Sequence, residues 1–414
     1  MLKTKASRGL SRRPVADAAL PALLCFSHLR WDFVYQRPQH LMSRFAQRRR
    51  VYYVEEPTFG SGAARYELSA REHGLRVVVP RLPHGLSEEE RDASLRHVVD
   101  ELMQAEDITD FVAWYYTPMA LPWTRHLEAE TVVYDCMDEL SLFRGAPREI
   151  VDRERELIAM ADVVFAGGAS LYEAKRHRSS NVHCLPSSID ASHFRRARTF
   201  DGDPADQAKI PHIRLGFAGV IDERMDIELL DGLAAARPDW HLVLVGPVVK
   251  IDPAQLPRRA NIHYLGSKPY AELPAYLSGW DIALLPFALN EATRFISPTK
   301  TPEYLAAGCP VVSTPIRDVV NPYGIAELAR IAHTVQGFIA AVEGELARPD
   351  DVRRSWLTRV DGFLSTMSWD RTHRQMAALI SRADTDDADA RASVIASARQ
   401  AVSAGTRYDL ALEA

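Results

Sequence analysis

The 414-residue sequence lacks any apolar run near the roughly 20 residues that a transmembrane helix needs. The apolar run at 20–26 is interrupted by Pro21 and has no small-residue cleavage pattern, so we expect no signal peptide. The four cysteines are Cys25, Cys136, Cys184 and Cys309. They form no Cys-x-x-Cys pair and lie in or beside apolar runs, which predicts buried, reduced thiols in a cytoplasmic protein and no zinc site.

The sequence also lacks an excess of positive charge. Lys plus Arg number 50 and Asp plus Glu number 55, a net charge of −5. A mildly acidic chain with a pI near 6.3 does not have the electrostatic character of a nucleic-acid binder, so we expect no nucleic-acid partner. Hydrophobic residues at 47% and charged residues at 25% are ordinary for a soluble globular protein, and the length predicts two to three domains.

The two ends of the chain lack a periodic apolar pattern. We interpret residues 1–18, which are basic, as a disordered arm, and residues 385–414, rich in Ala, Asp, Ser and Arg, as a flexible tail. The Lys and Arg residues of the arm leave two interpretations open, a solvated tail or contact with a membrane surface. We therefore expect a cytoplasmic protein, with a peripheral position at the inner membrane face as the alternative.

Between the ends, short apolar runs alternate with longer amphipathic stretches. The runs, which are typical of strands buried on both faces, are 22–26, 51–54, 75–79, 111–114, 132–134, 163–166, 213–218, 241–245, 262–265, 282–285 and 311–313. The predicted helices are 38–49, 87–104, 148–160, 226–236, 270–278 and 334–346. This alternation predicts an α/β protein with doubly wound parallel sheets.

The alternation pauses at 195–211, a charged stretch without a periodic apolar face, which we interpret as a linker. We therefore expect one Rossmann-like domain at 19–200 and a second at 201–367. In such sheets, ligands bind outside the carboxyl ends of the strands. Two domains that face each other would place a cleft between those ends.

Several motifs appear in a specific order in the second half. They are Ala161-Asp-Val-Val-Phe165, Asn181-Val-His-Cys-Leu-Pro-Ser-Ser-Ile-Asp190, Asn261-Ile-His-Tyr-Leu-Gly266, Pro269-Tyr-Ala-Glu-Leu-Pro274, Trp280-Asp-Ile-Ala-Leu-Leu-Pro286, Glu303-Tyr-Leu-Ala-Ala-Gly-Cys-Pro-Val-Val312 and Ser368-Trp369-Asp370. In order and spacing they resemble GT-B group 1 glycosyltransferases of the family 4 type. The resemblance covers about 160–380, whereas the first domain matches only in its strand rhythm.

The resemblance implies a GT-B fold and the transfer of a sugar from a nucleotide-sugar donor. The donor would bind the second domain, and the acceptor, a cell-surface glycan or a lipid-linked precursor, would bind the first. A metal or other cofactor would not be needed, and the anomeric configuration would be retained. The last helix, 368–384, would cross back to the first domain.

Transfer leaves negative charge on the departing diphosphate, which cationic side chains and free backbone N–H groups can stabilise. Ser297, Thr299 and Lys300 precede a helix predicted at 302–307, with Pro302 near its start and Gly308 at its end. By resemblance, Lys300 would neutralise the diphosphate and Glu303 would accept the ribose hydroxyls. Alternatively, Glu303 only complements the helix N-terminus and Lys300 is solvated.

Two further segments of the second domain are candidates for donor binding. Gly219 ends the strand 213–218, and Arg224, five residues later, is a candidate phosphate-binding cation; a surface arginine is the alternative. Gly246, after the strand 241–245, would shape the nucleotide side or form a plain turn.

The sequence departs from the family at three positions. Val220 and Met225 stand where the family often has Arg and Lys, so that Arg224 would replace both. Phe295 stands where the family has the first glutamate of a pair, which normally touches the transferred sugar. This substitution leaves the donor sugar and the choice between retention and inversion open. The neighbours that could replace the glutamate are Asn290, Glu291, Thr293 and Arg294.

Polar and aromatic residues follow the strands of the first domain. Our catalytic candidates are Asp138 and then Asp135, carboxylates that would orient or deprotonate an acceptor hydroxyl, and His28. The acceptor-binding candidates are Arg37, Tyr115 and Tyr116. The alternatives are a helix-capping role for the carboxylates, a structural role for His28, and core packing for the tyrosines.

Two other functions remain open from the sequence. One is a GT-B nucleotide-sugar epimerase or sugar-phosphate synthase that uses the same donor site. The other is a non-catalytic scaffold that binds sugar nucleotides, which Phe295 favours and the spacing of Lys300 and Glu303 opposes. An NAD-binding enzyme is not expected, because no G-x-G-x-x-G follows a predicted strand.

Overall fold

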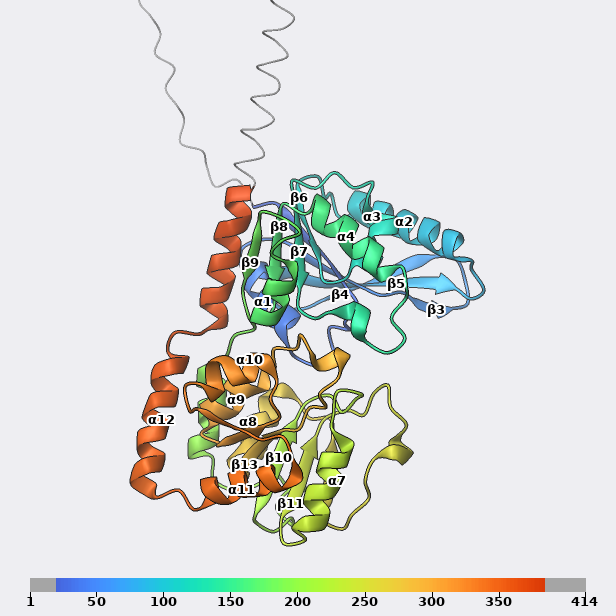
Figure 1. The fold of residues 1–414 in the computed structure, drawn as a ribbon. Helices are drawn as coiled ribbons and strands as arrows, with labels where there is room; N and C mark the ends of the chain where they lie inside the picture. Colours follow the sequence, from blue (N-terminus) through green and yellow to red (C-terminus); the bar gives the residue numbers. More distant parts are fainter. Residues whose placement is uncertain (1–19, 384–414) are drawn as a thin grey trace, which may run out of the picture.

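A computed structural model describes residues 20–383, so the predicted arm at 1–18 and tail at 385–414 lie outside the described residues. The chain forms two domains, each built on a largely parallel sheet with helices on both faces (Figure 1). The predicted α/β fold with two Rossmann-like domains is confirmed. The domain bounds given above stay a prediction.

The first sheet has nine strands in the order β3-β5-β2-β1-β6-β7-β8-β9, with β4 antiparallel to β5 and the other pairs parallel. The strands are β1 Ala22–Ser27, β2 Val51–Glu55, β3 Thr58–Gly60, β4 Arg65–Ala70, β5 Leu75–Pro83, β6 Phe111–Tyr115, β7 Thr131–Cys136, β8 Val163–Ala166 and β9 Val182–Cys184.

The second sheet has six parallel strands in the order β12-β11-β10-β13-β14-β15, which is the 3-2-1-4-5-6 order of a dinucleotide-binding fold. The strands are β10 Arg214–Ala218, β11 His241–Val245, β12 Ile262–Gly266, β13 Ile282–Leu285, β14 Val311–Ser313 and β15 Ala329–Ile331.

The helices cover both faces of each sheet. In the first half they are α1 Arg37–Ala46, α2 Glu88–Ala105, α3 Leu121–Thr124, α4 Ile150–Met160, α5 Ala169–Lys175 and α6 Ala191–Arg195. In the second half they are α7 Ile227–Ala236, α8 Leu273–Ser278, α9 Lys300–Ala307, α10 Arg317–Val319, α11 Val335–Leu346 and α12 Asp350–Leu364. A last helix spans 369–383.

Strand β1 shows why the apolar runs become buried strands. Leu24 and Phe26 share one apolar cluster with helices α2 to α5, whereas Leu23 and Cys25 share another with α1 and the last helix. Since neighbouring side chains of a strand point to opposite faces, a strand covered on both sides must be apolar throughout. This explains why continuous apolar runs, rather than alternating ones, predicted the parallel strands.

The structure differs from the predicted elements in a few places. The predicted helix 270–278 is a 3-10 turn, Tyr270–Glu272, followed by α8, and α9 begins two residues earlier than predicted. The predicted linker 195–211 is bound to the second domain, where the fully buried Gln207 accepts a hydrogen bond from Trp280 Nε1 at 2.9 Å. The short strands β3, β4, β9 and β15 were not predicted.

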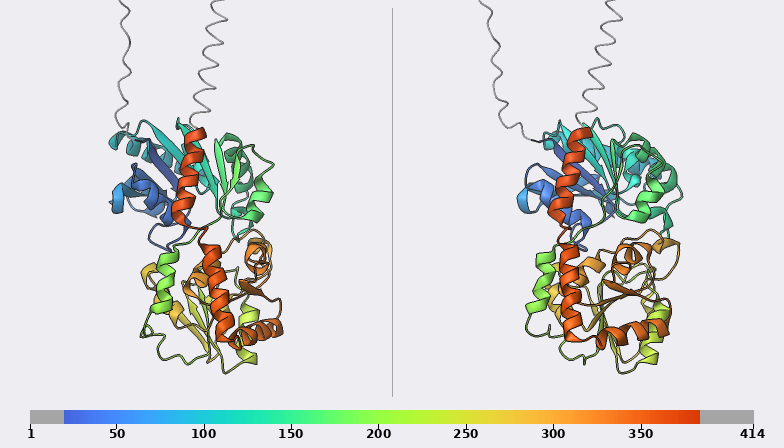
Figure 2. Two further views of the ribbon diagram at one scale, coloured as in Figure 1. Left: turned by 90° about the vertical axis from the view of Figure 1, so that its left-hand side faces the viewer. Right: turned by 60° about the vertical axis from the view of Figure 1, so that its left-hand side comes forward.

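The last helix returns to the first domain after α12 has run along the second (Figures 1 and 2). Trp369, Met376 and Ile380 belong to the same buried cluster as Leu41 of α1. The ring of Trp369 stacks on His40 with centroids 4.6 Å apart, and Asp370 pairs with Arg44 at 2.6 Å. The helix that begins after Ser368 therefore joins the two domains.

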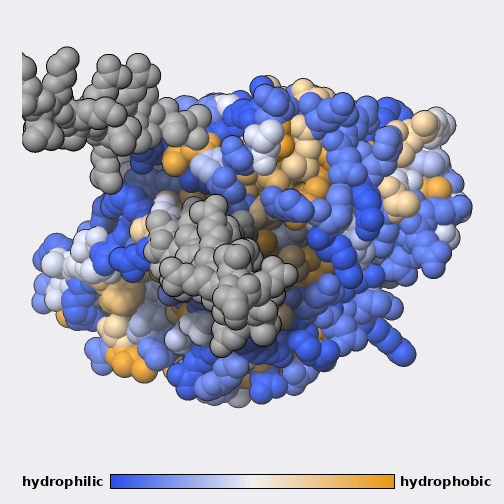
Figure 3. Space-filling view, turned by 90° about the horizontal axis from the view of Figure 1, so that it is seen from above, coloured by the Kyte–Doolittle hydropathy of each residue, from blue (hydrophilic) through white to orange (hydrophobic). Residues whose placement is uncertain are grey.

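Seen from the first-domain end, the described surface is largely hydrophilic, with apolar residues in small groups (Figure 3). Scattered apolar residues of this kind are normal for a protein surface. Among residues 20–383, no helix combines the length and the apolar character that crossing a bilayer requires.

Candidate active site

The site lies where the strand order reverses in both sheets. In the first sheet this point is between β1 and β6, and in the second between β10 and β13. The loops that leave β1 and β10 diverge there and open a crevice at the carboxyl ends of the strands. Three cavities lie along this crevice, and each is lined by residues of both domains.

Cavity A, of about 290 Å³, is lined by residues 31–35 of the first domain and by Gly219, Gly246, Lys268 and Lys300 of the second. Cavity B, of about 130 Å³, is lined by Asp138 of the first domain and by Gly219, Arg224, Ser297, Thr299 and Lys300 of the second. Because Gly219 and Lys300 line both cavities, A and B adjoin at these two residues.

Helix α9 positions the main cationic group at this junction. The helix begins after Thr299 and ends at Gly308, whose φ of 84° is the left-handed value that glycine adopts easily. Lys300 Nζ donates to Glu303 Oε2 at 2.6 Å, one helical turn along, so Lys300 is not solvated. Burial raises the pKa of Glu303 above its ordinary value, although Lys300 lies beside it. Ser297 and Thr299 lead into this helix and face cavity B, as predicted.

Gly219 and Gly246 bring two backbone segments into direct contact beneath cavity A. Gly246 has a φ of 146°, and a Cβ built on it would lie 1.8 Å from the Gly219 carbonyl oxygen. No other residue type fits there. Tyr304 of α9 fixes the preceding strand end, since its hydroxyl accepts from Ala218 N at 2.7 Å. The backbone of these two glycines therefore forms part of the wall of cavity A.

Arg224 lines cavity B but is neutralised by a carboxylate that the sequence analysis missed. Its Nε lies 3.0 and 3.1 Å from the two oxygens of Asp222, and its Nη2 lies 2.7 Å from Oδ2. The guanidinium also lies over the Phe143 ring, 5.4 Å from its centroid. Arg224 is therefore held in place between the two domains rather than free at the surface.

Asp138, our first catalytic candidate, lines cavity B opposite the second domain. Burial raises the pKa of Asp138 to about 6, an effect that Arg224 opposes and Asp222 reinforces. A half-buried carboxyl group that titrates near neutral pH and faces the donor side can accept a proton or orient a hydroxyl group.

Asp135 and Arg37 are placed differently from our expectation. Their side chains are fully buried and form a two-point ion pair, with Arg37 Nη2 2.7 Å from Asp135 Oδ1. Arg37 Nη1 also donates to the Leu185 carbonyl at 2.9 Å. Neither residue lines cavity A, cavity B or the third cavity, described below as cavity C, so the structure gives both a structural role at the base of α1 instead of a catalytic or acceptor-binding role.

Tyr115 and Tyr116 are buried, with 2% and 1% of their surface exposed. The Tyr115 hydroxyl donates to Thr124 Oγ1 at 2.9 Å within the core. With no exposed ring face, neither can stack on a sugar, and core packing, the alternative named above, replaces the predicted acceptor-binding role.

Cavity C, of about 390 Å³, lies next to cavity B and belongs mostly to the first domain. His28 lines it, and burial together with the nearby Lys250 lowers the pKa of His28 to about 4, so the ring is neutral at pH 7. Among the described residues, His28 Nδ1 has no hydrogen-bond partner. The wall of the cavity is largely apolar, formed by Leu95, Met119, Trp123, Phe143 and Ile150.

Phe143 connects cavity C to cavity B. The guanidinium of Arg224 lies over the Phe143 ring, and Lys250 Nζ of the second domain lies 5.3 Å from the centroid of that ring. Phe143, Asp222 and Lys250 are therefore parts of the site that the sequence analysis missed. Asp222 could have been found from the sequence, because it lies only two residues from Arg224. The contacts of Phe143 with Arg224 and Lys250 join residues far apart in the chain, so no local pattern indicates them.

Phe295, which replaces the family's first glutamate, packs half-buried against the apolar cluster of the first domain. The four residues named as its substitutes do not line cavity B. Asn290 and Thr293 cap the 3-10 turn Glu291–Thr293, and Glu291 and Arg294 form an ion pair at the surface. The structure therefore shows a contact between domains, and no replacement carboxylate, at this position.

A second contact between the domains lies beside this loop. Asp318 of α10 accepts from the backbone N–H groups of Ala169 and Ser170, at 2.9 and 3.2 Å, at the start of α5. A Cβ at Gly168 would lie 2.4 Å from Asp318 Oδ2 and 2.7 Å from Ser297 Cβ. Glycine at 168 thus allows the loop before α9 to approach the first domain.

Within residues 20–383, no cluster of three or more His, Cys, Asp or Glu side chains is arranged to hold a metal ion. The charged residues that line cavities A and B are instead Lys300, Arg224, Lys268, Asp138 and Asp32. Independence from metal stays a prediction.

Two Rossmann-like domains with a crevice between their strand ends define the GT-B class. Solved structures share this fold over most of the chain. Sucrose-phosphate synthase from Thermosynechococcus elongatus has a TM-score of 0.63 at 15% identity, covering 88% of this chain and 99% of that one. HepE of Anabaena, solved with UDP and glucose, has a TM-score of 0.61 at 13% identity, covering 87% and 99%. At these identities the likeness shows the fold alone.

Sequence comparison gives the family. Residues 214–348 match the family model "Glycosyl transferases group 1". The "Putative teichuronic acid biosynthesis glycosyltransferase TuaH" of Bacillus subtilis (strain 168) is 26% identical over 311 residues, which cover 69% of this chain and 77% of that protein. Residues 214–348 therefore form a group 1 glycosyltransferase domain, and the chain is a glycosyltransferase with the GT-B fold; its assignment to family 4 stays a prediction.

Proposed function

We propose that this enzyme transfers a sugar from a nucleotide-sugar donor, bound along cavities A and B, to an acceptor bound in cavity C. The observation that carries the proposal is that Gly219 and Lys300 line both cavity A and cavity B, so the two cavities meet at these residues. A nucleotide sugar is linear, with its diphosphate between the nucleoside and the sugar. With the diphosphate at Lys300, the nucleoside lies in cavity A and the sugar lies in cavity B.

In this arrangement, the bond between the sugar's anomeric carbon and the diphosphate oxygen breaks while the acceptor oxygen bonds to that carbon. Lys300 and the N-terminal N–H groups of α9 stabilise the charge that develops on the departing phosphate. The proton of the acceptor hydroxyl passes to a phosphate oxygen on the same face or to Asp138. Retention of the anomeric configuration, without a metal ion, is part of the proposal.

Cavity C suits an acceptor with an apolar part. Its wall carries Leu95, Met119 and Trp123, and His28, directly after β1, also lines it. We propose a cell-surface glycan or its lipid-linked precursor as the acceptor, which is supported by the similarity to the putative teichuronic acid biosynthesis glycosyltransferase of Bacillus subtilis. Peripheral contact with the inner membrane face would give access to such an acceptor.

A sugar phosphate is the second candidate acceptor. Lys250 lines cavity C and forms no ion pair among residues 20–383, so it is available to a phosphate group. A trehalose-phosphate synthase from Burkholderia xenovorans, solved in complex with glucose-6-phosphate, shares the fold with a TM-score of 0.61. In that case, Lys250 would bind the acceptor phosphate.

The experiment has two stages. Thermal-shift measurements with nucleoside diphosphates and nucleotide sugars identify the donor, because a ligand that binds only the folded state raises its stability. The full-length enzyme then receives that donor with a lipid-linked saccharide, a soluble oligosaccharide or a sugar phosphate, and product is followed by mass spectrometry and its anomeric configuration by NMR. Transfer to the lipid-linked or soluble saccharide supports the proposal. Transfer to the sugar phosphate alone replaces it with the second candidate, and a donor that binds without any transfer contradicts both.

A further inference from the structure

The loop after β1 carries an aromatic segment, residues 31–35, that reaches from the first domain into cavity A. Trp31, Phe33 and Tyr35 are its three aromatic residues. Phe33 is 51% exposed and Tyr35 is 37% exposed. Large apolar rings that stay exposed within a cavity favour a ligand that covers them.

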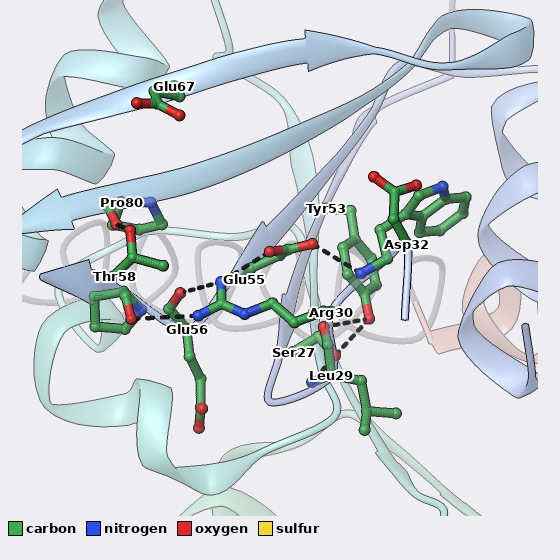
Figure 4. Close-up of polar contacts among 12 residues, drawn as sticks. Ser27, Leu29, Arg30, Asp32, Tyr53, Glu55, Glu56, Thr58, Glu67 and Pro80 are labelled. Atoms are coloured by element: carbon green, nitrogen blue, oxygen red, sulfur yellow. Dashed lines mark hydrogen bonds and ion pairs between the residues drawn. The ribbon is translucent and has the colours of Figure 1, made fainter. Parts of the chain in front are cut away.

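The start of this segment is fixed by polar contacts to β2 and the residues that follow it (Figure 4). Arg30 Nη1 donates to Glu55 Oε2 at 2.8 Å and to the Glu56 carbonyl at 2.7 Å. The other oxygen of Glu55 accepts from Trp31 N at 2.8 Å, and the Tyr53 hydroxyl donates to the Leu29 carbonyl at 3.0 Å. The loop is therefore held in one conformation before it enters cavity A.

The segment is also fixed at two further points. Gln39 Nε2 donates to the Trp31 carbonyl at 2.7 Å, and the Trp31 ring meets Tyr53 edge to face at 5.0 Å. The Tyr35 ring stacks on Tyr270 of the second domain with centroids 4.7 Å apart. In the part of the chain that the structure describes, Phe33 is thus the aromatic residue of the segment whose ring has no aromatic partner.

We propose that Phe33 stacks on the nucleobase of the donor. This inference rests on the proposed function, because it needs the nucleoside in cavity A. The base is the flat apolar part of a nucleotide sugar, and an exposed ring on a rigid loop loses little entropy when the base covers it. Lys300, at the junction of cavities A and B, takes the diphosphate and so leaves the rest of cavity A to the nucleoside.

Two consequences follow from the position and chemistry of Phe33. Its ring has no hydrogen-bonding atom, so it contributes to affinity for every base and does not choose among them. Because Phe33 belongs to the first domain and Gly246 and Lys268 to the second, one bound base contacts both domains. Donor binding then favours the arrangement of the two domains that the structure shows.

Calorimetry with the full-length protein tests this inference. The ligands are UDP, GDP, ADP and inorganic pyrophosphate, which lacks a base. The variants are Phe33→Ala, Phe33→Leu, Phe33→Trp and, as a matched control, Phe200→Ala, whose ring is 44% exposed away from the three cavities. Phe33→Ala should weaken each nucleoside diphosphate that the wild type binds by about 10- to 100-fold, the scale of one lost base stack, and should leave pyrophosphate unchanged.

Phe33→Trp should retain wild-type affinity, Phe33→Leu should fall between Trp and Ala, and Phe200→Ala should match the wild type. Equal loss for pyrophosphate and nucleoside diphosphates would overturn the inference, because the loop would then act on the diphosphate. Unchanged affinity in Phe33→Ala would overturn it as well, while the proposed function would stand. If the wild type binds none of the nucleoside diphosphates, the proposed function and this inference both fail.

Discussion

Lys300 Nζ and Glu303 Oε2 lie 2.6 Å apart at the start of α9, and the two side chains are 16% and 8% exposed. The two side chains form an ion pair with each other. A diphosphate and a ribose that bind here must replace this pair with contacts of their own. The ion pair therefore couples the two halves of the predicted nucleotide contact.

Removal of the Lys300 ammonium group should weaken nucleoside diphosphate binding. A lost charged contact corresponds to about 1.5–3 kcal/mol, so Lys300→Ala should weaken binding by roughly 10- to 100-fold. Calorimetry with and without EDTA measures this effect and tests metal independence together. Lys209→Ala, an exposed lysine outside the three cavities, is the control. Loss of wild-type binding in EDTA would show that a metal ion takes part.

Glu303→Gln separates the ribose contact from the ion pair. The change keeps the shape of the side chain but removes its charge, which weakens two hydrogen bonds from the ribose and releases Lys300. Nucleoside diphosphate affinity should fall about tenfold, since charge-assisted hydrogen bonds are stronger than neutral ones. Pyrophosphate, which has no ribose, should bind at least as well as to the wild type. If both ligands lose affinity equally, Glu303 acts only through the helix.

Asp138→Asn should retain donor binding and lose turnover by roughly 10²–10⁴-fold if the carboxylate takes the acceptor's proton. A smaller loss is expected if the departing phosphate takes the proton and Asp138 only positions the hydroxyl. With its pKa at about 6, the wild type should lose activity as the pH falls through 6, and the variant should lack this step. A pH profile of turnover measures both. Near-native turnover in Asp138→Asn would direct the search to His28.

The same raised pKa predicts an effect of Asp138→Asn on stability. The folded state binds the Asp138 proton more tightly than the unfolded state, so this group's contribution to stability falls as the pH rises from about 4 to 6. At pH 7 the wild type holds a half-buried carboxylate that the variant lacks. Denaturant unfolding should show Asp138→Asn to be more stable by about 1–3 kcal/mol at pH 7, with little difference at pH 4. A destabilised variant at pH 7 would contradict this expectation.

Asp135→Asn and Arg37→Ala should affect stability far more than the chemical step. Each variant leaves the other member of a fully buried ion pair without its partner, which costs about 3–5 kcal/mol. Thermal unfolding should show a large loss for both variants. The turnover of the folded fraction should stay near that of the wild type. A selective loss of turnover at unchanged stability would return Asp135 to the catalytic candidates.

The contrast between Asp135 and Asp138 shows what the sequence could predict. The apolar runs predicted the strands because burial on both faces leaves a continuous pattern. The predicted strand ended at Tyr134, but β7 continues to Cys136, which places Asp135 inside the sheet and Asp138 beyond it. A difference of two residues in the end of one strand therefore decides which carboxylate reaches the crevice.

Local spacing predicted which residues lie together in the second domain better than in the first. Ser297, Thr299, Lys300 and Glu303 lie within one turn and its approach, so their spacing alone brings them together. Asp135 and Arg37 are 98 residues apart, and Phe143 and Arg224 belong to different domains. Pairs of this kind depend on how the sheets and domains pack, which no short pattern in the sequence records.

The last helix has a consequence for the order in which the chain is made. Trp369, Met376 and Ile380 share one buried apolar cluster with Leu41 and Cys25, which are synthesised more than 300 residues earlier. At about 5–20 residues per second, roughly 20–80 s pass before the helix that covers them is synthesised. During this interval the amino-terminal half exposes an apolar surface that the rest of its own sheet cannot cover. This apolar cluster can therefore be completed only after the helix at 369–383 has been synthesised.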